Sequence, residues 1–113
     1  MIAKENFIAI LSSYIKDFEF VNVKPVLYEK TGGMGPDKNE ILSHVHHRFI
    51  EFAKFLQTDA REMDYPPILS AFSFLQGSLW AVGFYSYNKI LDDLDSIEVN
   101  PTIESIFDLP DED

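Results

Sequence analysis

Apolar residues recur at intervals of three and four along two stretches of the chain, as they do on one face of an α-helix. The first stretch predicts a helix over residues 4–17. Its apolar face consists of Phe7, Ile10, Leu11, Tyr14, Ile15 and Phe18. The second stretch predicts a helix from Pro36 or Asp37 to Gln57, because a first-turn proline and early acids favour a helix start. At about 100° per residue, one arc of this helix carries Ile41, Leu42, Val45, Phe49, Phe52, Ala53 and Leu56.

The segment between these two helices has a different character. Residues 19–28 are rich in β-forming side chains but are interrupted by Pro25, which cannot donate to a central sheet ladder. We therefore expect an extended segment here, with an edge strand as one alternative. Three glycines and one proline within residues 31–36 predict a loop before the second helix.

Residues 66–88 contain no charged side chain, and they predict a third helix from Pro66 to Val82. Interspersed serines and the absence of flanking basic residues argue against a membrane span. We expect a central helix that its neighbours bury on most sides. Ser73, Gly77 and Ala81 lie four apart and form a groove that allows close approach of another helix. Phe74 lies off the main apolar face, so this helix is the predicted contact of a possible homo-oligomer.

Local signals divide the last third of the chain. Gly83 suits the end of the third helix, and Ser86 suits the N-cap of a fourth helix over residues 87–95. Asn100 and Pro101 predict the start of a short last helix that ends near Phe107. The predicted fold is mostly α, a small bundle of four to five helices with one extended segment near residues 19–28. We expect residues 1–109 to form one domain and residues 110–113 to form a frayed acidic tail.

Composition narrows the class of protein. The chain has 113 residues, 19 acidic and nine basic side chains, a formal charge of −10 and no cysteine. It therefore forms no disulfide and no zinc–thiolate site, and its acidity disfavours direct binding to nucleic acid. The absence of cysteine and of a secretory signal pattern favours a cytoplasmic location.

The negative charge is concentrated at one end. Residues 1–89 contain ten acids and nine bases, whereas residues 90–113 contain nine acids and no base. Such a block is either a solvated surface that keeps the chain soluble or a docking surface for a basic protein. The second interpretation assigns partner binding to these acids and to two nearby tyrosines, of which Tyr85 is expected to be the more exposed. The predicted residues are Asp92, Asp93, Asp95, Glu98, Glu104, Asp108, Tyr85 and Tyr87.

A third group of residues suggests a metal. Glu40, His44, His47 and Glu51 are spaced by four, three and four, so they lie along one stripe of the second helix. Two imidazoles and two carboxylates are suitable ligands for zinc or another divalent ion. The stripe lies opposite the apolar face, however, so a solvated polar surface is favoured over a metal site.

No nucleophile, phosphate-binding or dinucleotide-binding motif is present, so we expect neither an enzyme nor a bound cofactor. The sequence favours a small acidic interaction protein that docks its C-terminal quarter on a basic partner. Inhibitors, immunity proteins, antitoxins and phage counter-defence factors act in this way. The alternative is an oligomeric helical bundle that binds a small ligand or a divalent metal.

Overall fold

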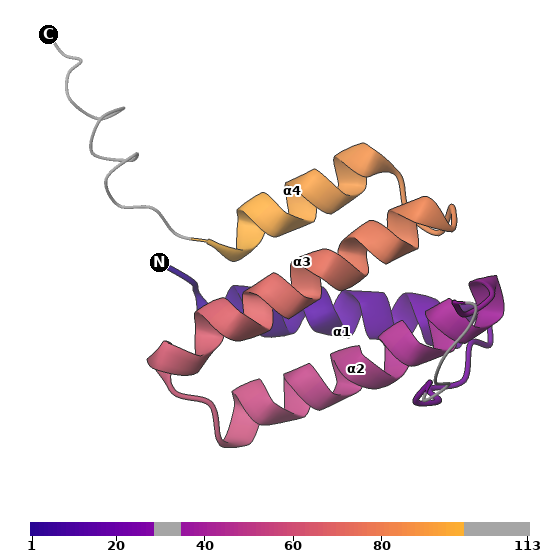
Figure 1. Cartoon of the computed structure of the whole chain (residues 1–113). Coiled ribbons are helices and arrows are strands. Elements are labelled where there is room, and N and C mark those ends of the chain that lie inside the picture. Colours follow the sequence, from indigo (N-terminus) through magenta and orange to yellow (C-terminus); the bar gives the residue numbers. More distant parts are fainter. Residues whose placement is uncertain (29–34, 99–113) are drawn as a thin grey trace, which may run out of the picture.

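The chain folds into a bundle of α-helices. The computed structural model describes residues 1–28 and 35–98, and within them it has four α-helices, a single 3-10 turn and no strand. The α-helices are α1 (Lys4–Phe20), α2 (Lys38–Thr58), α3 (Tyr65–Ala81) and α4 (Tyr87–Ile97), and the turn η1 (Glu62–Asp64) precedes α3 (Figure 1). The mostly α bundle of four to five helices is confirmed. The predicted last helix near residues 101–107 and the tail at residues 110–113 lie outside the described residues.

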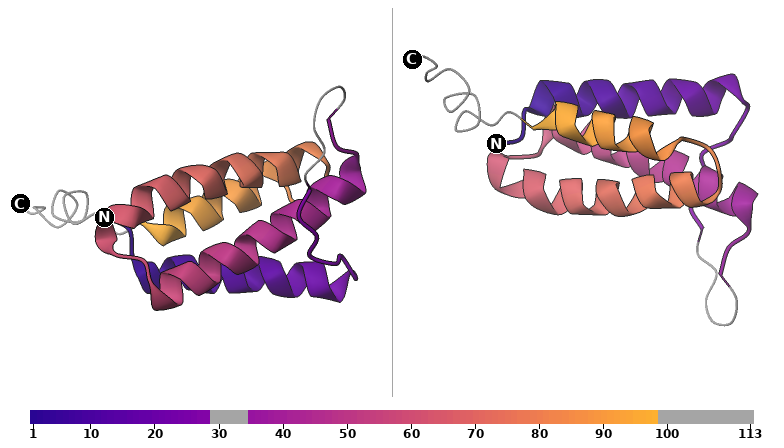
Figure 2. Two further views of the ribbon diagram at one scale, coloured as in Figure 1. Left: turned by 60° about the horizontal axis from the view of Figure 1, so that its bottom comes forward. Right: turned by 90° about the horizontal axis from the view of Figure 1, so that it is seen from above.

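Successive helices run in opposite directions and close into a ring. Each helix packs against the next one along the chain, and α4 returns to pack against α1. Figure 2 shows α4 between α1 and α3, on the side of the bundle away from α2. The short connections from α2 to α3 and from α3 to α4 favour this order, because neighbours in sequence then become antiparallel neighbours in space. A hydrogen bond of 3.0 Å from the Ala3 amide to the Ile97 carbonyl fastens the chain start to the end of α4.

The core is built from the apolar faces of all four helices and is rich in aromatic rings. Phe72 of α3 lies 5.2 Å from Phe7 and 5.0 Å from Phe49, measured between ring centroids. All the apolar residues predicted to face inward from the first two helices are buried or half-buried. The three- and four-residue spacing therefore identified these two faces correctly.

The helix ends follow local chemistry with small shifts from the predicted positions. Asp37 is the N-cap of α2, where its carboxylate accepts from the Glu40 amide at 2.9 Å and its own amide donates to the Glu40 side chain. Gly83 ends α3 with a φ of 79°, as expected, because glycine adopts this left-handed conformation without a steric cost. Ser86 caps α4 by accepting from the Lys89 amide.

The predicted extended segment is only partly correct. Residues 19 and 20 belong to α1, which ends at Phe20 and is followed by Asn22 with a left-handed φ of 64°. The chain then runs irregularly along α2, without forming an edge strand. The Val26 amide donates to the Ser43 carbonyl, and the Val23 carbonyl pairs with the ring of His46. The surface of α2 beside this segment offers isolated hydrogen-bonding groups. A strand needs a continuous row of backbone partners instead.

The prediction that α3 is buried on most sides is wrong. Only Phe72, Leu75, Gln76 and Leu79 are buried, and the opposite side of the helix faces solvent. In a closed ring of four helices, each helix keeps one face toward solvent. The absence of charged residues in α3 therefore did not mean that the whole helix is buried. None of the helices in residues 1–28 and 35–98 combines the length and the apolar character needed to cross a membrane.

Candidate functional site

A polar cluster at the junction of α1, α3 and α4 determines which acids of α4 reach the surface. The Tyr14 hydroxyl donates to Asp93 at 2.7 Å and accepts from the Gln76 amide at 3.1 Å. Tyr14 and Gln76 are both buried. Asp93 is therefore engaged inside the bundle, although the sequence assigned it to the partner-binding surface.

Lys89 belongs to the same cluster. Its ammonium lies 2.8 Å from Asp93 and about 5 Å from two ring centroids, at 5.4 Å from Tyr14 and 5.1 Å from Tyr85. The carboxylate balances the lysine charge, and the electron-rich ring faces add a cation–π attraction. Lys89 is the basic residue of α4, and its charge is paired with Asp93 although its side chain remains 38% exposed.

Tyr85 also points inward, contrary to the prediction that it is the more exposed tyrosine. Its hydroxyl donates to Asp17 of α1, and its ring lies 4.6 Å from that of Tyr14. Burial raises the pKa of Tyr85 far above its ordinary value, and the hydrogen bond to Asp17 raises this pKa further. Burial and the bond to Asp93 have the same effect on the pKa of Tyr14. Both hydroxyls therefore stay protonated and act as donors.

The outer face of α4 carries a row of apolar and acidic side chains. Tyr87, Leu91 and Asp95 follow one another at four-residue intervals, so they lie along one line of the helix surface. Tyr87 is 58% exposed and Leu91 is 39% exposed. Asp92 and Asp95 are also exposed, and so is Glu98 at the end of the helix.

An exposed tryptophan extends this row onto α3. The indole of Trp80 is 54% exposed and packs edge-on against Tyr87, with 6.1 Å between ring centroids. Small domains usually bury such large side chains, and no local sequence signal marks the exposure of this one. We call this surface the α4 face: Trp80, Tyr87, Leu91, Asp92, Asp95 and Glu98.

The helices that build the α4 face carry more acidic than basic side chains. The α3 sequence contains no charged residue, and the one base of α4 is paired with Asp93. Of the predicted docking residues, the structure thus leaves Tyr87, Asp92, Asp95 and Glu98 exposed. It withdraws Tyr85 and Asp93 from the surface. Glu104 and Asp108 lie outside the described residues.

The predicted metal stripe does not assemble into a site. No three His, Cys, Asp or Glu side chains in the described ranges are grouped as a metal centre requires. Glu40 belongs to the capping box of α2, and His47 pairs with Glu51 at 3.3 Å. His44 Nδ1 accepts from the Tyr28 amide at 3.1 Å. Residues one turn apart thus satisfy one another locally, as side chains on an exposed stripe commonly do.

His44 also differs electrostatically from a free surface histidine. Partial burial lowers its pKa below the usual value, and the nearby Arg48 guanidinium lowers it further. The neutral ring keeps a lone pair on Nδ1 for the Tyr28 amide. His44 therefore helps to hold the irregular segment after α1 against α2.

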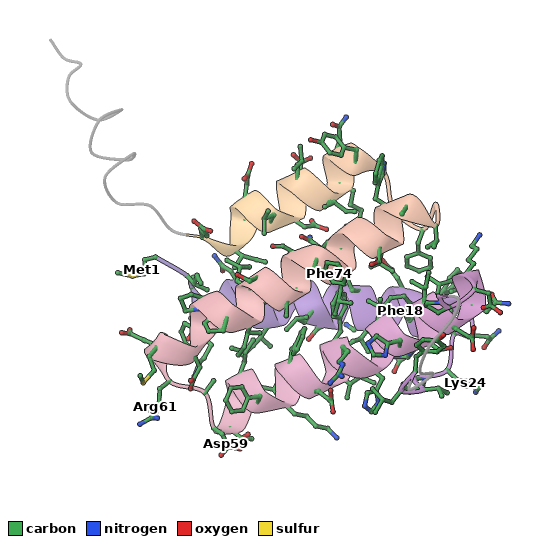
Figure 3. All side chains as sticks on the ribbon, viewed as in Figure 1. Met1, Phe18, Lys24, Asp59, Arg61 and Phe74 are labelled. Atoms are coloured by element: carbon green, nitrogen blue, oxygen red, sulfur yellow. The ribbon has the colours of Figure 1, made fainter. Side chains whose placement is uncertain are left out.

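The predicted oligomer-contact residues remain on the outer side of α3. Gly77, Ala81 and Phe74 are exposed, and Ser73 is half-buried. Phe74 is 74% exposed, near the middle of the helix (Figure 3). This surface lies beside the α4 face but is uncharged. Comparisons with protein-family models, curated proteins and solved structures found no match for this chain.

Proposed function

We propose that the protein is a small acidic interaction protein that binds a basic protein partner through the α4 face. The observation that carries this proposal is the pairing of exposed aromatic rings with acids on one surface. Trp80 and Tyr87 contact each other, α4 also exposes Asp92 and Asp95, and Lys89 is paired with Asp93.

The chemistry of the α4 face matches that of a protein-binding surface. Trp and Tyr are enriched among the residues that contribute most to binding, because they bury a large rigid area. Carboxylates beside them steer a basic partner toward the surface and disfavour acidic competitors. An arginine-rich partner fits best, since a guanidinium pairs with a carboxylate and also stacks on an aromatic ring.

This mode of action suits an inhibitor, an immunity protein or an antitoxin. Such proteins need a fast and specific encounter with a target, and a compact acidic surface provides it without a catalytic group. The partner's own functional surface would be basic, and bound protein would cover it.

The test compares two pairs of neutralising substitutions with the same change in net charge. The first pair, Asp92→Asn with Asp95→Asn, changes the α4 face. The control pair, Asp59→Asn with Glu62→Gln, changes exposed acids between α2 and α3. Immobilised protein is used to capture a partner from a lysate of the source organism. The purified partner's affinity is then measured for both pairs across a range of salt concentrations.

We expect the captured protein to be basic and its association to slow as salt rises. The Asp92 and Asp95 pair should weaken binding by about tenfold or more and flatten the salt dependence. The control pair should change both quantities much less. Equal weakening by the two pairs would show that only total charge matters, and salt-independent binding would contradict the proposal.

A further inference from the structure

The segment that follows α1 is held on the surface of α2 by hydrogen bonds that differ in their response to acid. Three bonds fasten residues 23–28, and two of them involve histidine rings. They join the Val23 carbonyl to His46 Nδ1 at 2.8 Å, the Val26 amide to the Ser43 carbonyl at 3.1 Å, and the Tyr28 amide to His44 Nδ1 at 3.1 Å. The bond between Val26 and Ser43 involves backbone groups alone, so it does not titrate.

The partner of each ring determines how its bond responds to a second ring proton. The Val23 carbonyl can only accept, so His46 Nδ1 donates to it, and this bond survives protonation of the ring. The Tyr28 amide can only donate, so His44 Nδ1 accepts from it with a lone pair. Protonation of the His44 ring uses that lone pair and sets two N–H groups against each other. Acid therefore breaks the bond at Tyr28 and leaves the bond at Val23 in place.

The charged neighbours of His44 on α2 do not compensate for this loss. Arg48 Nε lies 3.5 Å from His44 Nε2, farther away than the Tyr28 amide is from Nδ1, so the lone pair of the neutral ring serves the amide. The guanidinium and the nearby His47 both oppose a positive charge on the ring, and Glu51 favours it. Glu51 is already paired with Arg48 and with His47.

The other groups that face this ring add no carboxylate to stabilise its charged form. α3, which packs against α2, contains no Asp, Glu, Lys or Arg. The segment after α1 contributes the phenol of Tyr28, which lies near Glu40 and Asp37. Both of these acids are engaged in the capping box of α2. A charged His44 ring thus finds no unpaired carboxylate among these neighbours.

Tyr28 forms one wall of an apolar hollow between α2 and α3. The hollow has a volume of about 390 Å³, and its other walls include Val45, Phe74 and Leu75. His44 lines the same hollow, so the ring that fastens Tyr28 lies at the wall that Tyr28 provides. Loss of this bond removes the attachment of Tyr28 at the hollow.

We propose that the bond between His44 and the Tyr28 amide is an acid-sensitive latch, which closes the hollow at neutral pH and opens it when the ring is protonated. The bonds of Val23 and Val26 do not depend on a lone pair of a ring, so they keep the rest of the segment on α2. Opening is therefore confined to the Tyr28 end and exposes the apolar walls of the hollow. This latch is independent of the partner binding proposed for the α4 face.

Hydrogen exchange of single backbone amides, followed by NMR on the full chain, tests the latch. Exchange rates are divided by the intrinsic rate at each pH, which gives the protection of each amide. Between pH about 7 and 5, where histidines titrate, the protection of the Tyr28 amide should fall by about threefold or more, with the midpoint of the His44 ring. The Val26 amide should keep its protection and is the internal control. Unchanged protection at Tyr28, or an equal loss at both amides, would overturn the proposal.

Two matched variants assign the acid response to one ring. His44→Asn places a carbonyl oxygen near the position of Nδ1, so it keeps an acceptor for the Tyr28 amide and removes the titration. The Tyr28 amide should then stay protected over the whole pH range. His47→Asn removes the neighbouring imidazole that pairs with Glu51 and should keep the acid response. An acid response that persists in His44→Asn, or that is lost in His47→Asn, would overturn the proposal.

Fluorescence of Nile red, an uncharged apolar dye, measures whether the hollow opens. A neutral dye is chosen because the chain carries a charge of −10, which would repel an anionic dye to an extent that changes with pH. The emission of the dye should rise on acidification of the wild-type protein, with the midpoint of the His44 ring, and should stay low with His44→Asn. No rise with the wild type, or an equal rise with both proteins, would overturn the opening of the hollow.

Discussion

The hydroxyl of Tyr14 on α1 donates a 2.7 Å hydrogen bond to Asp93 on α4, 79 positions further along the chain. This bond turns one acid of an acidic segment into the bundle, where it also pairs with the base of the same helix, Lys89. The outer side of α4 is left with Asp92 and Asp95. The interior contact thus shapes the surface that we propose for partner binding.

Replacing Tyr14 with phenylalanine tests the cluster. The ring stays, but Asp93 loses a donor and Gln76 loses an acceptor. We expect the free energy of unfolding to fall by about 1–3 kcal/mol, because these polar groups are poorly accessible to water. Urea denaturation of Tyr14→Phe measures this loss.

A double-mutant cycle distinguishes a hydrogen-bonded cluster from simple packing. Gln76→Met keeps the size of the buried side chain and removes its amide. It should cost less in the Tyr14→Phe background than in the wild type, with a coupling of about 0.5–3 kcal/mol. Additive losses would show that Tyr14 and Gln76 contribute independently.

The raised pKa of Tyr85 predicts a loss of stability in alkaline solution. Above pH about 10 the unfolded chain releases the phenol proton, whereas the folded protein retains it because of burial and the bond to Asp17. The unfolded state then binds fewer protons, so the free energy of unfolding falls as pH rises. Tyr14 adds to the same trend.

Denaturation between pH 9 and 11, a window of about one unit around the phenol value, measures this slope. Tyr85→Phe should be less stable at neutral pH and should show a shallower alkaline decline than the wild type. The control is Tyr87→Phe, which removes a hydroxyl from a 58% exposed ring and leaves the bond from Tyr85 to Asp17 in place. An unchanged slope in Tyr85→Phe would contradict the raised pKa of Tyr85.

His44 should titrate below the ordinary histidine value of about 6.5, because partial burial and Arg48 disfavour its charged form. A proton NMR titration of the ring gives this midpoint directly. Arg48→Met should raise this midpoint only part of the way toward the ordinary histidine value, since burial is the larger cause of the lowered pKa. Because the pKa of His44 is lower in the folded protein than in the unfolded chain, the free energy of unfolding falls as pH drops below the unfolded-state pKa. His44→Gln should therefore reduce the change in this free energy between neutral and mildly acidic pH. A midpoint at or above the ordinary value would contradict the described environment.

The sequence predicted those features that depend on neighbours along the chain. The apolar faces of α1 and α2 were identified from spacing alone, and the ends at Gly83 and Ser86 from local backbone chemistry. The end of α1 was predicted too early, because Asn22 provides the left-handed residue where glycine is more common. These features need no information from distant parts of the chain.

The candidate site could be predicted only in part, because it depends on contacts between distant segments. Asp92 and Asp93 are adjacent in sequence, yet only Asp93 meets Tyr14. The inward position of Tyr85 depends on Asp17, which is 68 residues away. Exposure of Trp80 depends on how α4 packs across α3. Counting charges along the chain cannot distinguish these cases.

Site-specific photo-crosslinking at position 87 tests the central claim most directly. A photoreactive phenylalanine analogue replaces Tyr87 on the α4 face, and in the control it replaces Phe20, which is 87% exposed on another helix. In cells of the source organism, the first protein should form an adduct with a basic protein, and the second should not. Equal adducts from both positions, an acidic partner, or no adduct at position 87 would contradict the account.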